Sequence, residues 1–352
     1  MKKAVLHISV ILILALIILN AQTAITYAVE AMSICVYMIV PTLFPFFICS
    51  GLLIYSGFCE KMAMLFQFCM MPLFRVSPAG SSAFVLGIIS GYPLGAATAG
   101  ELFLNNYLTK TEAERLLAFC NNSGPLFILG SVGVAMYSQI KYGVILYAIH
   151  IISAITVGII FRFYKQNDYT APKTTMTSPE RSLGEVFSIS LQNAISTILT
   201  VCGAVIFFSI ISRLLLDLIP ISGMLSSLAA GFCEFVTGTT MVSSLDINIA
   251  KKLVLTAFII GFAGLSVHVQ VMAVIAKYHL SMLPYIIGKL LHGVIAAIYT
   301  VIYLHFFPIT ISVFAPSASK GFAASSAYAT LSVSVIAIMG IILSFWATRK
   351  KV

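Results

Sequence analysis

Long runs of hydrophobic residues, separated by short polar stretches, extend through the whole chain. Runs that predict membrane-spanning helices lie at 4–19, 30–55, 115–135, 142–163, 183–214, 249–277, 283–306 and 325–346. Polar and apolar residues do not alternate along these runs, which excludes a membrane β-barrel. The pattern therefore predicts an all-α polytopic membrane protein with eight spanning helices.

Two of these runs are interrupted near their middle by residues that break helices. Asn121–Pro125 reads Asn-Asn-Ser-Gly-Pro, and Gly261–Gln270 reads Gly-Phe-Ala-Gly-Leu-Ser-Val-His-Val-Gln. Main-chain groups freed by such breaks need partners, so broken helices occur within protein or beside a watery cavity. One break alone is compatible with a kinked packing helix. Two breaks at corresponding places in two halves are typical of a transporter's substrate site.

Two further apolar segments, 81–104 and 221–245, contain too many turn-forming residues for simple spans. The first contains Ser90–Ala96, which reads Ser-Gly-Tyr-Pro-Leu-Gly-Ala, and its Gly91 and Gly95 correspond approximately to Gly231 and Gly238 in the second. We predict two re-entrant hairpins, each entering and leaving on one face of the membrane. For 81–104 a tightly packed helix of small residues is the alternative.

The charge distribution supports the hairpin prediction. Hydrophobic residues make up 60% of the chain and charged residues 9%, with a net charge of +9. Cytoplasmic loops are enriched in Lys and Arg, which explains this charge without a nucleic-acid partner. With two re-entrant hairpins, the basic linker at 162–181, both termini and most other basic residues fall in the cytoplasm. Lys251 and Lys252 are the exception. The second half is then inverted relative to the first.

These elements divide the chain into five regions. They are an N-terminal transmembrane helix (1–24), a first repeat (25–164), a cytoplasmic linker (165–181), a second repeat (182–306), and a loop with a C-terminal transmembrane helix (307–352). The first helix is interpreted as retained, with a cleaved signal peptide as the alternative.

Local signals add detail to these regions. Pro41 and Pro45 predict a bend or one unwound turn in the second span. Thr109 and Glu112 predict a capping box at the start of the first broken helix. Residues 60–78 predict an amphipathic segment lying in the membrane interface. The seven cysteines lack metal-type spacing and are interpreted as small buried hydrophobic residues.

The helix N-termini that follow the two breaks offer free amides and the positive end of a helix dipole to a solute. The candidate solute-binding residues are Tyr92, Asn121, Asn122, Ser123, Gly124, Gly264, Ser266, His268 and Gln270. Asn121, Asn122 and Ser123 in the first half, and Ser266, His268 and Gln270 in the second, supply neutral donors. We expect no cation at midspan. Tyr92 could stack on a ring of the solute, but an aromatic residue at a hairpin tip is as often structural.

Few ionisable residues fall within the apolar runs. Glu234 is an acid in such a run, where a carboxylate costs about 3 kcal/mol on insertion scales. It is a candidate for proton or ion coupling, with hydrogen bonding to the hairpin backbone as the structural alternative. His268 is a candidate ligand or proton carrier. His150, His292 and His305 have no evident partners and are interpreted as packing or interfacial residues.

Several of these motifs resemble one protein family. Gly91–Ala96, Glu112–Leu117 with Asn121–Pro125, and Gly264–Gln270 resemble motifs of the YlbJ sporulation integral membrane protein family, also called stage V sporulation protein VV. The resemblance extends over nearly the whole chain. It implies nucleoside-recognition or gate-type repeats like those of concentrative nucleoside transporters. It also implies a role in endospore formation, moving dipicolinate across the mother-cell-derived outer forespore membrane.

The residues themselves predict a membrane transporter of a small polar or anionic solute, and dipicolinate follows only from the resemblance. A nucleoside transporter, another small-solute transporter, and a non-transporting scaffold needed for spore cortex formation are the alternatives. No enzyme is predicted, since the chain contains neither His-Glu-x-x-His nor Gly-x-Ser-x-Gly. No cofactor or metal site is expected. The expected partners are the solute and the lipid bilayer, and the sequence allows a homo-oligomer.

Overall fold

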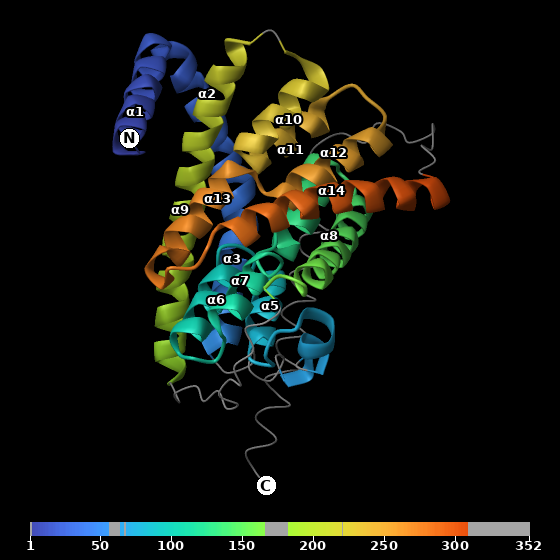
Figure 1. Cartoon of the computed structure of the whole chain (residues 1–352). Helices are drawn as coiled ribbons and strands as arrows, with labels where there is room; N and C mark the ends of the chain where they lie inside the picture. Colours follow the sequence, from blue (N-terminus) through green and yellow to red (C-terminus); the bar gives the residue numbers. More distant parts are fainter. Residues whose placement is uncertain (1, 56–63, 67, 166–181, 220, 309–352) are drawn as a thin grey trace. The chain divides into compact units, whose positions relative to one another are not determined.

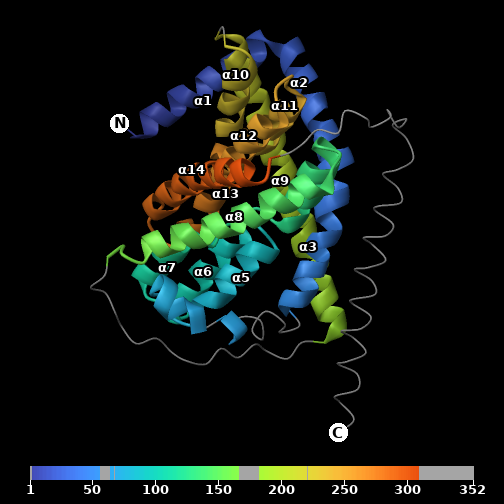
Figure 2. The same cartoon turned by 90° about the vertical axis from the view of Figure 1, so that its right-hand side faces the viewer.

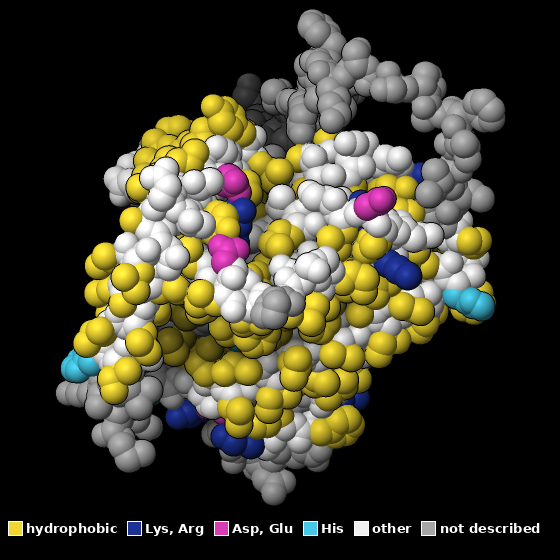
Figure 3. All heavy atoms as spheres, turned by 90° about the horizontal axis from the view of Figure 1, so that it is seen from above, with side chains coloured by type: hydrophobic (Ala, Val, Ile, Leu, Met, Phe, Trp, Pro, Cys, Tyr) yellow, Lys and Arg dark blue, Asp and Glu magenta, His cyan; other side chains and the backbone are white. Residues whose placement is uncertain are grey.

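A computed structural model describes residues 2–55, 64–66, 68–165, 182–219 and 221–308. All regular secondary structure in these ranges is helical. Five helical segments are long and apolar enough to span a membrane: Ala21–Ile39, Ile140–Phe161, Leu183–Asp217, Ile249–Ile275 and Leu283–Phe306. On the face seen in Figure 3, hydrophobic side chains are spread over much of the surface and charged side chains appear in few places. The chain is therefore an all-α polytopic membrane protein.

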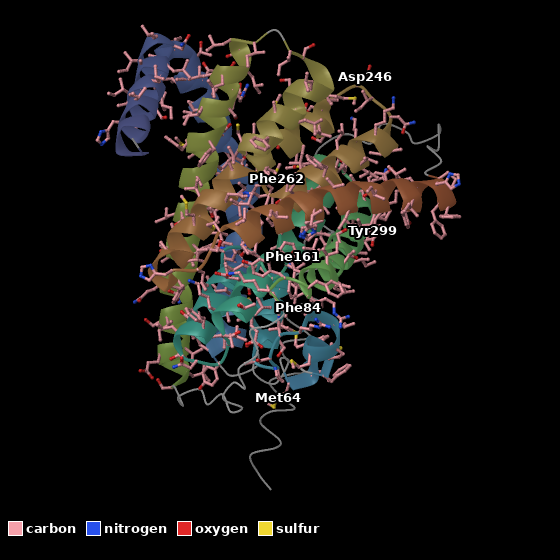
Figure 4. All side chains as sticks on the ribbon, viewed as in Figure 1. Met64, Phe84, Phe161, Asp246, Phe262 and Tyr299 are labelled. Carbon is pink, nitrogen blue, oxygen red and sulfur yellow. The ribbon has the colours of Figure 1, made fainter. Side chains whose placement is uncertain are left out.

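Some predicted elements fall outside the described residues. They are the C-terminal helix at 325–346 with the basic residues after it, most of the linker at 165–181, and part of the interfacial segment at 60–78. Within that segment, residues 64–66 and 68–69 are helical and a π-helical turn, η2 (Met70–Phe74), follows. Met64, which is labelled in Figure 4, is exposed.

The N-terminal part consists of helices that pack along one very long helix. After α1 (Lys2–Leu19), α2 (Ala21–Ile34) passes through a π-helical turn, η1 (Cys35–Ile39), into α3 (Val40–Tyr55). Both α2 and α3 lie along α9 (Leu183–Asp217). With its 35 residues, α9 is about 52 Å long at 1.5 Å per residue, longer than the hydrocarbon core is thick.

The structure refines the prediction for the proline-containing span. The helix begins at Ala21 instead of Glu30, and the turn before Pro41 is widened to π geometry instead of unwound. Pro41 has no N–H to donate to the carbonyl of Tyr37, so the regular hydrogen-bond ladder cannot continue through it. A wider turn, in which the N–H of Val40 reaches the carbonyl of Cys35, absorbs this defect.

The first half of the chain contains the predicted hairpin and broken helix. The hairpin is formed by α5 (Gly80–Ile89) and α6 (Leu94–Leu104), which pack together and are joined by a turn at 90–93. A continuous helix of small residues is therefore wrong for this segment. The broken helix consists of α7 (Lys110–Leu117), an irregular stretch at 118–124 and η3 (Phe127–Met136), and α8 (Ile140–Phe161) follows.

The second half repeats this order of elements. Its hairpin is formed by α10 (Gly223–Cys233) and α11 (Phe235–Ser244). The broken helix is α12 (Ile249–Phe262) followed by α13 (Gly264–Ile275), and after η4 (Ala276–Tyr278) comes α14 (Leu283–Phe306). In Figures 1 and 2 the two hairpins lie on opposite sides of α13 and α14. The inverted relation of the halves in the membrane stays a prediction.

The start of the first broken helix is anchored by buried polar side chains. The predicted capping box is confirmed, because Thr109 Oγ1 accepts from the Glu112 amide at 3.2 Å and Glu112 Oε2 accepts from the Thr109 amide at 2.8 Å. Arg115 donates to the carbonyls of Arg75, Tyr164 and Lys165 at 2.7–2.8 Å. These bonds fix the position of α7, and hence the place where the first break begins.

Glycines let each hairpin approach the break of its own half. Gly87 of α5 and Gly95 of α6 face each other and the Cys120 carbonyl, which a Cβ at either position would overlap. Gly231 and Gly238 likewise face each other across α10 and α11. The structural counterpart of the pair Gly231 and Gly238 is thus Gly87 with Gly95, instead of the predicted Gly91 with Gly95.

We expect Gly95→Ala to lower the free energy of unfolding by about 1–3 kcal/mol, because the new methyl group overlaps the Cys120 backbone. Gly203→Ala is the matched control: a Cβ added to this helical glycine of α9 would meet no neighbouring atom within 4 Å, so alanine should be neutral or stabilising. Thermal unfolding in detergent measures both variants. Equal melting temperatures for the two would contradict the tight contact between hairpin and break.

Candidate functional site

The two hairpin tips and the first break meet in the interior of the described chain. The Tyr92 ring, in the first hairpin turn, lies edge-on to the ring of Phe235 at the start of α11, with centroids 5.4 Å apart. The Tyr92 hydroxyl is 3.4 Å from Ser123 Oγ. Phe127, just after the break, also contacts Phe235, at 5.0 Å. Predicted residues of the first half therefore come together at the tip of the second hairpin.

A small cavity lies at this junction. Its volume is about 30 Å³, and its walls include Tyr92, Ser123, Gly124 and Phe235. Pockets that hold small organic molecules have volumes of about 300–1,000 Å³, whereas one water molecule occupies about 30 Å³ of liquid. The junction is therefore closed to an organic solute in this conformation.

Main-chain groups at the first break are bonded by side chains from other helices. The Ser123 amide donates to Nε2 of His150 on α8 at 3.1 Å, and the Asn121 carbonyl accepts from Nζ of Lys289 on α14 at 3.1 Å. The side-chain Nδ2 of Asn122 donates to the Phe119 carbonyl at 2.8 Å. In contrast, Oδ1 of Asn122 is buried and has no hydrogen-bond partner in the described chain. The buried side-chain amide of Asn121 lies beside the Tyr285 hydroxyl.

At the second break the chain turns through the left-handed region at Ala263 and Gly264, with φ of 70° and 69°. His268 Nδ1 lies 2.7 Å from the Gly264 carbonyl, so this histidine serves the break itself. Its Nε2, together with Ser266 Oγ and Gln270 Oε1, has no hydrogen-bond partner among the residues described. The His268 ring also contacts Phe262, labelled in Figure 4 at the end of α12.

The predicted residues form two groups, one around each break, and α14 connects them. Tyr285 of α14 contacts the His268 ring, with centroids 5.0 Å apart, and Lys289, one turn later, bonds the Asn121 carbonyl. The second group of predicted residues, Gly264, Ser266, His268 and Gln270, thus approaches the first group through α14.

Glu234 forms the turn of the second hairpin. Its carboxylate is fully buried and accepts hydrogen bonds from the amides of Val236 at 3.1 Å and Thr237 at 2.6 Å. This is the structural alternative considered for Glu234, and it satisfies amides at the start of α11 that no helical carbonyl can reach. A coupling role for the same carboxylate stays a prediction.

A cation is buried within a predicted span, although it lies nearer one end of the span than its middle. Lys289 lies well inside the apolar run of α14 and only 1% of its surface is exposed. Neither ion pair found in the described ranges involves it. Its place within an apolar run is the sequence signal that marks it as a candidate functional residue.

His150 and His292 are also more than isolated packing or interfacial residues. Both are buried, and their rings lie 4.3 Å apart where α8 and α14 run side by side (Figure 2). Farther along, Thr156 Oγ1 of α8 lies 3.0 Å from the hydroxyl of Tyr299, labelled on α14 in Figure 4. The two histidines occupy similar places in the two halves, which a search for local motifs does not detect. His305 is exposed near the end of α14.

The electrostatics of the junction favour a ligand that brings negative charge. Lys289 supplies a buried amino group that donates to the Asn121 carbonyl, and no carboxylate within the described ranges bonds it. At the same break, Nδ1 of His150 and Oδ1 of Asn122 are buried without a hydrogen-bond partner among the described residues. Each buried polar group without a partner costs about 1–3 kcal/mol, which a bound carboxylate would offset by accepting these donors.

A second, larger cavity of about 320 Å³ lies between α2, α9, α10 and α11. Serine and threonine side chains line much of it, and Arg213 forms an ion pair with Glu30 at its wall. Thr237, whose amide bonds Glu234, also borders it. This cavity therefore reaches the first turn of α11, next to the residue whose amide Glu234 bonds.

Comparison with known proteins finds one relative with substantial coverage. The sporulation integral membrane protein YlbJ of Bacillus subtilis (strain 168) is 30% identical over 324 residues, which cover 82% of this chain and 79% of the relative. No protein-family model matches the chain. No solved structure matches it.

We expect Lys289→Met to leave the melting temperature of the solute-free protein unchanged or to raise it, because methionine removes an unpaired buried charge while keeping an unbranched side chain. Lys141→Met, at an exposed position on α8, is the control for loss of one lysine charge. Thermal unfolding in detergent measures the melting temperatures of both variants and of the wild-type protein. A fall in melting temperature as large as that of Gly95→Ala would mean that Lys289 is present for stability.

Proposed function

Because the chain belongs to the family of the sporulation integral membrane protein YlbJ, we propose that it carries a small anionic solute, dipicolinate, from the mother cell towards the forespore. Its place would be the mother-cell-derived outer forespore membrane, with both termini in the cytoplasm. The identity of the solute is what the family resemblance implies. The chemistry of the junction supports an anion.

The observation that carries this proposal is the pairing of the first break with Lys289. Dipicolinate is a flat dianion whose two carboxylates flank a ring nitrogen. The Ser123 amide, at the N-terminal side of the helix after the break, suits one carboxylate oxygen. The Lys289 ammonium group, 3.1 Å from the Asn121 carbonyl, can bond another oxygen of the solute.

A single lysine also suits release of the solute. Lysine is a point charge on a flexible stem, whereas the planar guanidinium group of arginine clamps a carboxylate with two parallel hydrogen bonds. The remaining donors around the first break, Asn121, Asn122 and Ser123, are neutral. Together they can hold a dianion without the strength of a fully paired site, as a carrier requires.

Opening of the junction is the movement that transport requires. Tyr92, Phe127 and Phe235 close the 30 Å³ cavity by ring contacts between the two hairpin tips and the first break. Separation of the tips would free these ring faces, and the pyridine ring of the solute could then stack on them. Aromatic contacts within the protein would thus be exchanged for contacts with the solute.

Flux measurements in proteoliposomes test the proposal. We expect purified protein to admit labelled dipicolinate, with uptake inhibited by excess unlabelled dipicolinate, and to admit a labelled nucleoside much more slowly, since Lys289 would remain without an anion. Protein-free liposomes measure the leak. Uptake of the nucleoside without uptake of dipicolinate would assign the chain to uncharged solutes instead.

A variant at the first break separates a carrier from a scaffold. We expect Asn122→Ala to reduce dipicolinate flux at least about tenfold, because Asn122 shapes the break and faces it with an unbonded oxygen. Asn105→Ala is matched to it, because Asn105 makes the same kind of bond, at 2.8 Å to the Glu101 carbonyl, on an exposed helix end.

Membrane insertion and protein yield should be normal for both variants, and only Asn122→Ala should impair spore cortex formation. A scaffold would give the opposite pattern: normal cortex with Asn122→Ala, and no flux with the wild-type protein.

A further inference from the structure

We propose that His150 couples solute movement to a proton: the solute anion takes the Ser123 amide from His150, and the freed imidazole then binds a proton that crosses with the anion. This inference rests on the proposed transport function and adds its coupling ion and the residue that carries it.

The first step concerns the state of His150 in the closed, solute-free structure. Its Nε2 accepts a hydrogen bond from the Ser123 amide at 3.1 Å. A ring nitrogen that accepts such a bond carries no proton, so the imidazole is neutral and its hydrogen is on Nδ1. His150 is buried, and Nδ1 has no hydrogen-bond partner within the described ranges.

The second step is competition for one amide. The Ser123 N–H is the donor that the first break presents to a carboxylate, and in the closed structure His150 occupies it. One N–H makes one strong hydrogen bond, so a bound carboxylate displaces Nε2. The lone pair of Nε2 is then buried without a donor, which makes protonation the way to satisfy it.

The third step is the sign of the local charge. Without solute, a proton on His150 would lie beside the His292 ring, at 4.3 Å. It would also lie near Nζ of Lys289, because His150 bonds Ser123 and Lys289 bonds Asn121 of the same break. Like charges in a site of low dielectric disfavour that proton. A dicarboxylate reverses the local charge, and the proton then becomes favourable. Anion and proton binding therefore strengthen each other, as linkage requires of two coupled sites.

Other ionisable groups on the helices packed against α8 do not set the local charge at His150. No ionisable side chain occurs in η2 or η3. The ionisable residues of α7 have partners of their own. Glu112 accepts hydrogen bonds from Ser77 and Thr109, and Glu114 forms an ion pair with Lys165. Arg115 donates to three main-chain carbonyls. On α12, Lys252 bonds the Ser243 carbonyl at the helix start, and Lys141 is at the exposed start of α8. The groups that face His150 are therefore His292 and Lys289, with Cys120 of the break beside Lys289.

The exchange balances in bonds and charge. The Ser123 N–H to Nε2 bond breaks, and a Ser123 N–H to carboxylate bond forms. A proton from the aqueous side adds to the Nε2 lone pair and gives an imidazolium cation. The His292 ring lies next to the His150 ring, with centroids 4.3 Å apart, and can pass this proton on. Dianion and proton cross with a total charge of −1, and release reverses each step.

Accumulation against a pH gradient tests the coupling. Wild-type protein in proteoliposomes, with pH 7 on one side and pH 8 on the other, is given labelled dipicolinate while potassium and valinomycin hold the membrane potential at zero. With one proton per solute we expect accumulation of about tenfold on the alkaline side per pH unit. Downhill flux with an accumulation ratio of one would overturn the coupling and leave the proposed transport function intact.

His150→Gln tests the residue. Glutamine can still accept from the Ser123 amide but cannot take a proton, so the solute should equilibrate at a ratio of about one, whatever the rate. His305→Gln, at an exposed position on α14, is the matched control and should retain a ratio of about ten. A tenfold ratio with His150→Gln would overturn the assignment to His150.

A measurement on the wild-type protein keeps the inference testable if His150→Gln does not fold. Dipicolinate added to the protein in weakly buffered detergent solution near neutral pH should cause uptake of about one proton for each solute bound, and binding without proton uptake would overturn the coupling. No binding and no flux of dipicolinate would overturn the proposed function and this inference together.

Discussion

The arrangement of this protein depends on one constraint: main-chain amides and carbonyls exposed by a broken helix must find partners where lipid offers none. At the first break, side chains from α8 and α14 supply them, His150 for the Ser123 amide and Lys289 for the Asn121 carbonyl. At the second break, Glu234 caps the adjoining hairpin and His268 meets the Gly264 carbonyl. The need of main-chain groups at the breaks for hydrogen-bond partners therefore determines how distant helices pack.

The same constraint explains why ionisable residues are found so deep in the chain. A buried lysine without a carboxylate lowers stability, and so do histidine and asparagine groups that lack partners. Such groups gather around both breaks: Oδ1 of Asn122 and Nδ1 of His150 lie at the first, and Ser266, His268 and Gln270 lie at the second. Polar groups without partners beside a junction that can open are what a solute-binding site in its empty, closed state requires.

Local features of this fold could be predicted from sequence, whereas contacts between the halves could not. The breaks, both hairpins and the capping box of Thr109 follow from proline, glycine and capping preferences within a few residues. The π-helical turn before Pro41 was missed because proline predicts a defect without specifying its geometry. The place of Lys289 within an apolar run is visible in the sequence, whereas its contact with the first break is not. The His150–His292 contact depends on how α8 and α14 pack, which no local pattern encodes.

The measurement that tests the central claim most directly is a solved structure of the protein with dipicolinate bound. The account predicts a carboxylate on the Ser123 amide, the Lys289 ammonium group within hydrogen-bond distance of the solute, and the hairpin tips at Tyr92 and Phe235 moved apart. A structure with the solute bound elsewhere, and with His150 still bonded to the Ser123 amide, would contradict it.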